Sequence, residues 1–194
     1  MGTKTPDILL TLGILVKGIT KVEMSNGIGW VDTHCHLEDS QFDKDRGDVL
    51  HRAEQAGVRF VITLGSDILS SRKAIELTRR FDAVFAGIGI HPHEAKKVEK
   101  RAYSVLTELS KEPKVVAIGE VGLDFYRNNS SREQQEEVLR NQIRLAKKVK
   151  RPLVLHEREA HCDMIRILKD EHAWEVKGVI HCFTGGPQEV ENYV

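Results

Sequence analysis

The chain has 194 residues, with 29 Lys and Arg against 29 Asp and Glu, and 40% of its residues are hydrophobic. This length and composition predict one soluble globular domain and exclude a disordered or mainly membrane-embedded chain. The balanced charge argues against a broad basic surface for nucleic acid. Any contact with a polyanion must therefore be local, through a metal ion or a few Arg and Lys side chains in a cleft.

Residues 1–23 are predicted to be an N-terminal extension outside the fold. Their apolar stretch, 8–19, is too short to span a bilayer. It also lacks the strongly positive start and the small-residue cleavage site of a secretory signal. Met24 precedes the first predicted strand and would be a natural start. We therefore assign the fold to residues 24–194.

The cysteines indicate the cellular compartment. The chain has three, Cys35, Cys162 and Cys182, and none has the spacing of a metal-binding motif. We expect them to be small buried apolar residues in a protein from a reducing compartment, which places the protein in the cytoplasm.

Short apolar runs alternate with amphipathic stretches from residue 27 onward. The runs are almost continuously apolar and β-branched, which is typical of parallel strands buried on both faces. They cover residues 27–33, 58–64, 84–90, 115–119, 152–156 and 178–182. The stretches between them predict helices at residues 45–56, 67–80, 99–110, 131–149 and 158–170. The helix at 131–149 is the clearest, because Ser131 and Gln134 have the spacing of a capping box.

Alternating strands and helices without hairpin signals predict an α/β fold. Chemically reactive residues stand at the C-terminal ends of several strands, which favours a TIM (β/α)8-type barrel. A doubly wound open sheet is the alternative, although no glycine-rich phosphate loop follows the first strand. Only six of the eight barrel strands are found. We expect residues 24–194 to form a partial barrel that lacks the last two strands, as a fragment, a truncated gene product or a degraded paralogue.

Side chains that bind metal ions recur at the ends of these strands. His34 and His36 are one residue apart, so on a strand they point to one face while Cys35 points to the other. Four imidazoles and one carboxylate at one rim suit two divalent ions bridged by the carboxylate, and the device serves phosphoester hydrolysis. Such ligands have little selectivity among Mg²⁺, Mn²⁺ and Zn²⁺. The candidate metal ligands are His34, His36, Glu120, His156 and His181.

The segments around these residues resemble the TatD family of metal-dependent deoxyribonucleases, within the amidohydrolase-like barrels. The matching segments are 31–37 (VDTHCHL), 89–93 (GIHPH), 117–125 (AIGEVGLDF), 152–160 (PLVLHEREA) and 180–185 (IHCFTG). The likeness extends from about residue 28 to the C-terminus. It implies that His34 and His36 bind one metal ion, that His156 and His181 bind the other, and that Glu120 bridges them. The family's remaining ligand, an Asp at the end of the seventh strand, has no counterpart here.

Two further residues are catalytic candidates beside Glu120. His91 matches a family position near the metal ions. It either polarises the substrate and shapes the pocket, or holds a metal ligand in position. Arg158 either reaches a substrate phosphate or pairs with a neighbouring glutamate. Asp124 is interpreted as a supporting or turn residue. Among the other histidines we expect solvent exposure at His51, His161 and His172, while His93 is ambiguous.

The leading hypothesis, implied by the resemblance, is a metal-dependent DNA exonuclease with two metal ions and DNA as its substrate. An amidase or lactonase on a related barrel is the second hypothesis, although those sites commonly bridge their metals with a carboxylated lysine where this chain has Glu120. A phosphatase of the other H-x-H barrel family is a third. The non-enzyme alternative is an inactive remnant that only binds metal. No membrane partner is expected, and the sequence does not predict an oligomeric state.

Overall fold

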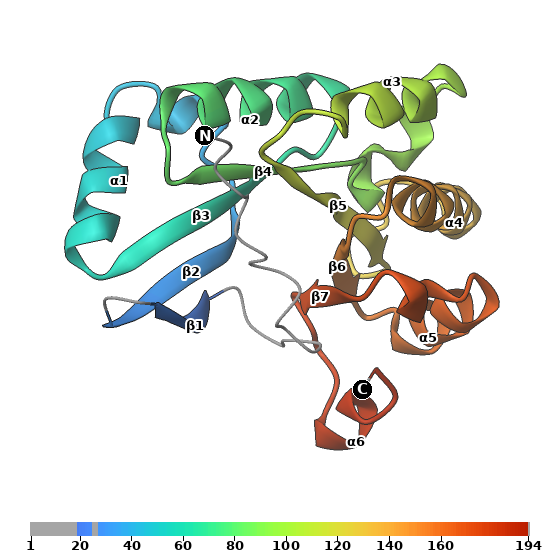
Figure 1. Cartoon of the computed structure of the whole chain (residues 1–194). Helices are drawn as coiled ribbons and strands as arrows, with labels where there is room; N and C mark the ends of the chain where they lie inside the picture. Colours follow the sequence, from blue (N-terminus) through green and yellow to red (C-terminus); the bar gives the residue numbers. More distant parts are fainter. Residues whose placement is uncertain (1–18, 25–26, 194) are drawn as a thin grey trace.

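The computed structural model describes residues 19–24 and 27–193, and it forms one sheet surrounded by helices (Figure 1). The seven strands lie side by side in chain order: β1 (Ile19–Met24), β2 (Gly27–Cys35), β3 (Val58–Leu64), β4 (Val84–Ile88), β5 (Val115–Asp124), β6 (Leu153–Arg158) and β7 (Gly178–His181). The helices are α1 (Arg46–Gln55), α2 (Ile68–Arg80), α3 (Arg101–Leu109), α4 (Arg132–Val149), α5 (His161–Asp170) and α6 (Pro187–Val190). Short 3-10 turns are η1 (Ser40–Phe42), η2 (Pro92–Lys97) and η3 (Ala173–Glu175).

The six strands β2–β7 are parallel and form a nearly closed TIM-like barrel, as predicted. Each strand pairs with the next along the chain, whereas a doubly wound sheet would reverse its order at a switch point. The rings of His34 and His181 stack with centroids 3.6 Å apart, so the C-terminal ends of β2 and β7 approach each other. The doubly wound alternative is therefore excluded.

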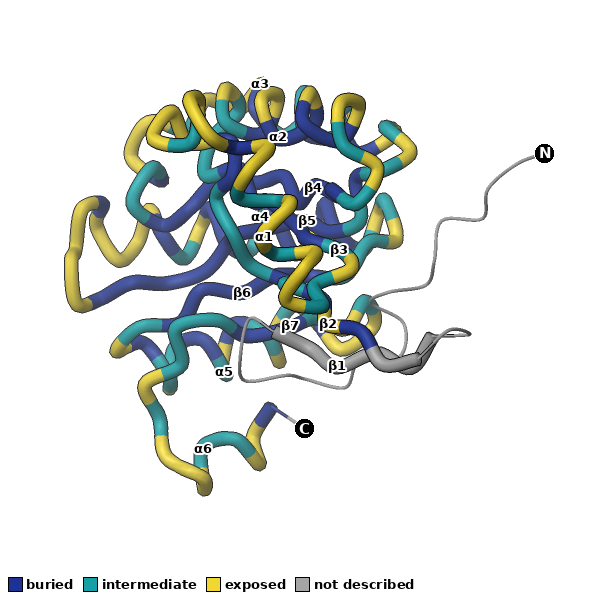
Figure 2. Tube along the Cα trace, turned by 90° about the vertical axis from the view of Figure 1, so that its left-hand side faces the viewer, coloured by how far each residue is buried: buried dark blue, intermediate teal, exposed yellow. Residues whose placement is uncertain are grey.

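Two layers of apolar side chains hold this arrangement together. The inner layer fills the barrel with Ile62, Leu64, Phe85, Ala117, Val154 and Val179. The outer layer joins the opposite faces of the strands to the helices, and includes Ile88, Leu106, Ile118, Leu139 and Met164. Figure 2 shows the result: buried strands at the centre and helices whose outward faces are exposed. Both faces of each central strand are buried, which explains their continuous apolar runs.

Helix α4 forms where the sequence predicts it. Ser131 accepts a hydrogen bond from the backbone N–H of Gln134, whose side chain reaches back to the Ser131 N–H, so the predicted capping box is present. The apolar stripe of Val138, Leu139 and Ile143 is buried. Capping satisfies backbone donors that would otherwise lack partners, and the stripe attaches the helix to the barrel.

The N-terminal boundary differs from the prediction. Residues 19–24 pair antiparallel with β2, from Ile19 opposite Asp32 to Met24 opposite Gly27. The predicted extension, 1–23, therefore includes backbone that joins the sheet, while residues 1–18 lie outside the described part of the chain. Within the described residues, no helix has the length and apolar character needed to cross a bilayer.

Candidate metal centre

Glu120 lies at the centre of the predicted site, inside β5 rather than at its end. The register of β5 against β6 shifts between Ile118 and Val121, so two residues of β5 stand opposite one of β6. Ile118 and Val121 both pack in the outer apolar layer. The bulge thus turns Glu120 into the barrel, where strict alternation from Ile118 would point it outward. The predicted strand end at residue 119 is wrong, because pairing with β6 continues to Asp124.

His34 and His36 face one oxygen of this carboxylate. Their Nε2 atoms lie 3.3 and 3.4 Å from Oε2 of Glu120. Cys35 points the other way, and its Sγ donates to the carbonyl of Ile62 at 3.4 Å, which confirms the predicted alternation. One ligand atom from each of His34, His36 and Glu120 lies within 4.8 Å of the others. The three could hold a metal ion together.

The other oxygen of Glu120 faces His156 and His91. Oε1 lies 2.6 Å from Nδ1 of His156 and 3.6 Å from Nε2 of His91, and the three residues form a second group within 4.8 Å. Nδ1 of His91 accepts a hydrogen bond from the backbone N–H of His93 at 3.1 Å, which leaves the ring proton on Nε2. In this tautomer His91 is a hydrogen-bond donor toward the centre of the site rather than a metal ligand.

His181 completes the ring of imidazoles from the end of β7. Its ring stacks on His34 at an interplanar angle of 17°. Burial, followed by the neighbouring His34, lowers the pKa of His181 to about 4. The imidazole is therefore neutral at pH 7, which is the form that binds metal ions.

The pKa values of Glu120 and of the neighbouring histidines depend on one another. Burial raises the pKa of Glu120, but hydrogen bonds from His156, His34 and His36 outweigh it and hold the pKa far below its ordinary value. The hydrogen bond to Glu120, with a second to Glu38, raises the pKa of His36 to about 10. Burial lowers the pKa of His91. Glu120 is thus a fixed negative charge among imidazoles, and burial keeps two of them, His91 and His181, neutral.

Glu38 supports the site and is absent from the sequence-based candidates. It is 7% exposed, and its Oε1 lies 3.2 Å from Nδ1 of His36. The hydroxyl of Thr63 donates to its other oxygen at 2.5 Å. Nδ1 of His36 also lies 2.9 Å from the carbonyl oxygen of Leu64, so it carries the proton that this oxygen accepts. These contacts orient the ring with Nε2 toward Glu120, as outer partners of metal-binding histidines do.

Two buried glutamines of α4 position the loops of the site, and neither is among the candidates. Gln142 accepts from the backbone N–H of Ile90 at 2.7 Å and donates to its carbonyl at 3.0 Å, which fixes the chain just before His91. Gln135 makes the same pair of bonds with the backbone of Asp124, at 2.8 and 3.2 Å. Polar residues inside an apolar helix face resemble surface residues in a sequence, so pattern alone does not reveal them.

Asp124 has the supporting position expected of it. Its Oδ2 lies 2.8 Å from Nε2 of His93 and 3.3 Å from Nε2 of His156. Its Oδ1 accepts from the backbone N–H of Arg127 at 2.8 Å, which closes the turn after β5. His93, ambiguous in the sequence, therefore contacts both Asp124 and His91, whose ring centroid is 4.3 Å from its own.

Arg158 lies at the rim of the barrel, beyond the imidazoles. Its guanidinium carbon is 4.0 Å from the ring centroid of Tyr126, a side chain that is 56% exposed. An arginine over an exposed aromatic ring keeps donors available to a ligand. Four histidines surround Glu120, and the ring of His181 stacks on that of His34. Arg158 lies outside this cluster.

Some predicted exposures are wrong. His51 and His172 are exposed as expected, whereas His161 is half-buried, with Nδ1 3.1 Å from the hydroxyl of Tyr193. Cys162 is exposed near the start of α5, and Cys35 and Cys182 are half-buried, so none of the three is the fully buried residue predicted. The apolar face of α5 is supplied by Met164 and Ile167 instead.

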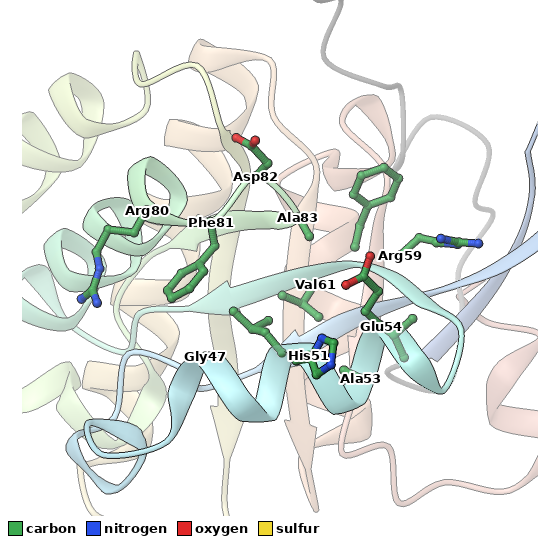
Figure 3. A pocket seen from close by; sticks show the side chains of 13 residues that line it. Gly47, His51, Ala53, Glu54, Arg59, Val61, Arg80, Phe81, Asp82 and Ala83 are labelled. Carbon is green, nitrogen blue, oxygen red and sulfur yellow. The ribbon is translucent and has the colours of Figure 1, made fainter.

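A separate pocket of about 460 Å³ opens at the other end of the barrel (Figure 3). Its walls come from α1, the N-terminal end of β3 and residues 80–83 before β4, and they include His51, Glu54, Arg59 and Asp82. None of the predicted metal ligands lines it. Active sites of parallel barrels form at the C-terminal ends of the strands, where Glu120 and the histidines lie.

The sequence profile of the TatD related DNases matches residues 31–194. The chain belongs to the TatD family. It is 41% identical over 157 residues to YabD of Bacillus subtilis, named an uncharacterized metal-dependent hydrolase, and the match covers 81% of this chain and 62% of YabD. It is 37% identical over 161 residues to the 3'-5' ssDNA/RNA exonuclease TatD of Salmonella typhimurium, which covers 82% of this chain and 62% of that protein. The chain thus spans less than two thirds of these relatives.

Solved structures of TatD proteins share the fold. YjjV, a TatD homologue from Escherichia coli K12, superposes with a TM-score of 0.78 at 33% identity, over 84% of this chain and 63% of YjjV. A hydrolase of the TatD family from Entamoeba histolytica gives 0.76 at 28% identity, over 83% and 60%. These likenesses agree with the barrel inferred from the strand order.

Proposed function

We propose that this chain is a metal-dependent phosphodiesterase that removes terminal nucleotides from single-stranded DNA. One observation carries the proposal: the two oxygens of Glu120 face different sets of imidazoles. Oε2 is turned to His34 and His36, and Oε1 to His156 and His91. A carboxylate with a separate ligand set on each oxygen is suited to bridge two cations.

The residues present fit a pair of divalent ions. Imidazoles with one carboxylate are ligands for Mn²⁺, Zn²⁺ and, less strongly, Mg²⁺. Nδ1 of His34 is buried without a hydrogen-bond partner in the described part of the chain, an unsatisfied polar atom of the kind that an ordered water or ion satisfies. The ligands would be His34, His36 and Glu120 for one ion and His156, His181 and Glu120 for the other. When bound, such ions lower the pKa of a water molecule and offset charge on the phosphate.

Within this proposal the remaining residues act on the substrate. His91 would donate its Nε2 proton in a hydrogen bond to a phosphate oxygen, because its depressed pKa keeps the ring neutral and its Nδ1 is already occupied. Arg158 would bind the next phosphate from the rim. Asp124 would hold the ring of His156 in place.

The choice of substrate rests on the relatives. The Salmonella protein is named a 3'-5' exonuclease of single-stranded DNA and RNA, and YabD is named a metal-dependent hydrolase. This chain covers 62% of each of these two proteins, and we propose the same kind of activity for it. Neutral net charge agrees with a short contact to one strand end rather than a long basic groove.

Degradation of end-labelled oligonucleotides tests the proposal. The chelator-treated protein is supplied with Mn²⁺ or Mg²⁺ and given single-stranded DNA or RNA labelled at the 5' end. We expect stepwise shortening from the 3' end that stops when chelator is added. Glu120→Gln, which removes the bridging charge at constant size, should lower the rate by at least about 100-fold. Glu54→Gln, an exposed glutamate in the pocket of Figure 3, should leave the rate unchanged.

Each alternative has its own outcome. Turnover of lactones or amides without nucleotide release would favour an amidohydrolase activity. Release of phosphate from monoesters alone would favour a phosphatase. Bound metal without turnover of any of these substrates would leave a metal-binding protein. Equal rates for Glu120→Gln and the unaltered chain would contradict the assignment of Glu120.

A further inference from the structure

Cys182 breaks the alternation of β7 and joins the histidines. Its backbone has φ of 57°, in the left-handed region that residues with a side chain rarely adopt. In a continuing strand, Cys182 would point away from the face of His181. Instead, Sγ of Cys182 and one ring nitrogen each of His156 and His181 all lie within 4.8 Å of one another.

This group differs in chemistry from the group around the other oxygen of Glu120. His34, His36 and Glu120 offer two nitrogens and an oxygen, whereas His156, His181 and Cys182 offer two nitrogens and a sulfur. Thiolate ligands favour Zn²⁺ and Co²⁺, while Mg²⁺ and Mn²⁺ prefer oxygen.

We propose that the thiolate of Cys182 binds the cation held by His156 and His181, so that this position selects Zn²⁺ over Mg²⁺ and Mn²⁺. The inference rests on the proposed metal site and adds that its two positions are unlike. On binding, the S–H bond breaks, the proton passes to buffer, and sulfur donates an electron pair to the cation, with no change of oxidation state. Burial raises the pKa of the free thiol, but a coordinating thiol is deprotonated by its cation.

The other two cysteines are matched controls. Cys162 is exposed on α5, and Cys35 donates to the carbonyl of Ile62 on the outer side of the barrel. Because the chain has three cysteines, replacing both with serine leaves Cys182 as the only thiol. A spectroscopic signal of sulfur coordination in that double variant must then come from Cys182.

Cobalt absorption tests the proposal without relying on activity. The whole chain is stripped with chelator and titrated with Co²⁺. Visible d–d bands report bound Co²⁺, and a near-ultraviolet sulfur-to-cobalt charge-transfer band reports a thiolate ligand. We expect both signals in the unaltered chain and in the Cys35→Ser/Cys162→Ser double variant. Cys182→Ser should keep d–d bands and lose the charge-transfer band. It should also weaken Zn²⁺ binding by more than the about 10- to 100-fold that losing an outer partner of a metal ligand costs, and leave Mn²⁺ binding unchanged.

The contrary outcomes are distinct. Visible bands without a charge-transfer band in the unaltered chain would overturn the role of Cys182 and leave the metal site intact. Loss of the charge-transfer band in the double variant would overturn it as well, by assigning the sulfur to Cys35 or Cys162. No Co²⁺, Zn²⁺ or Mn²⁺ binding at all would overturn the proposed function together with this inference. If Cys182→Ser fails to fold by circular dichroism, the double variant still decides.

Discussion

Replacing Glu38 with glutamine should weaken metal binding without unfolding the protein. The carboxylate of Glu38 is buried, contacts Nδ1 of His36 at 3.2 Å and accepts from Thr63 at 2.5 Å. Glutamine keeps the shape but removes the negative charge that favours Nδ1 of His36 as a donor. The ring of His36 then turns its Nε2 less firmly toward Glu120.

The size of the effect follows from the remaining contacts. Losing an outer partner of a metal-binding histidine typically costs about 10- to 100-fold in affinity, or about 1.4–2.7 kcal/mol. The carbonyl of Leu64 lies 2.9 Å from the same Nδ1 and still holds the ring in the variant. We therefore expect Glu38→Gln to raise the dissociation constant for Mn²⁺ by about 10-fold, the lower end of that range.

Calorimetric titration of the chelator-treated protein with Mn²⁺ measures this change. The unaltered chain is compared with Glu38→Gln and with Glu54→Gln, in which the same substitution is made on the exposed surface of α1. Thermal unfolding without metal shows whether either variant is destabilised. An unchanged dissociation constant in a folded Glu38→Gln protein would refute the argument that Glu38 orients His36.

Three other predictions test the fold and its electrostatics. Gly122→Ala should lower the free energy of unfolding in urea by at least about 2 kcal/mol, because φ of Gly122 is 151° and a Cβ there would meet a carbonyl oxygen of β6. A smaller loss would contradict the close approach of Gly122 to β6. The hydrogen bond to Glu120 raises the pKa of His36 to about 10, so metal binding at pH 7 should release a proton from His36 and become tighter as pH rises toward 9. Calorimetric heats of metal binding that do not depend on the buffer's ionisation enthalpy would argue against this proton release. Arg144 is the chief cause of the lowered pKa of Glu171, so this ion pair stabilises the fold above pH of about 4.5 and is lost as pH falls through the lower, folded pKa. Glu171→Gln should cost about 1 kcal/mol at pH 7 and little near pH of about 3; an equal cost at both would refute the linkage.

Most of the fold follows from local patterns in the sequence. The run at 58–64 coincides with β3 because Gly57 and Gly65 bound a mostly apolar, β-branched stretch. The length of β5 could not be predicted in this way, since its bulge is defined by the register of Ile118 and Val121 against β6. The pairing of residues 19–24 with β2 was missed for a similar reason: an added edge strand depends on the partner that it meets.

The site was predictable as far as the strand ends define it. His34, His36 and His156 meet because parallel strands present their C-terminal ends at one rim, whereas Glu120 reaches them through the bulge of β5. Glu38 was missed although H-x-H-x-E spacing extends the alternation of His34 and His36 by one more residue, and this was the available signal. The contact of Cys182 with the histidines depends on one left-handed residue, which the sequence does not reveal.

Anomalous diffraction from crystals grown with Mn²⁺ or Zn²⁺ would show directly whether Glu120 and the histidines bind two metal ions. We expect one peak about 2.0–2.3 Å from the ring nitrogens of His34 and His36 and an oxygen of Glu120, and a second bound by His156 and His181. Absence of both peaks from a crystal that has bound the metal elsewhere, for example beside His51 and Glu54, would contradict it.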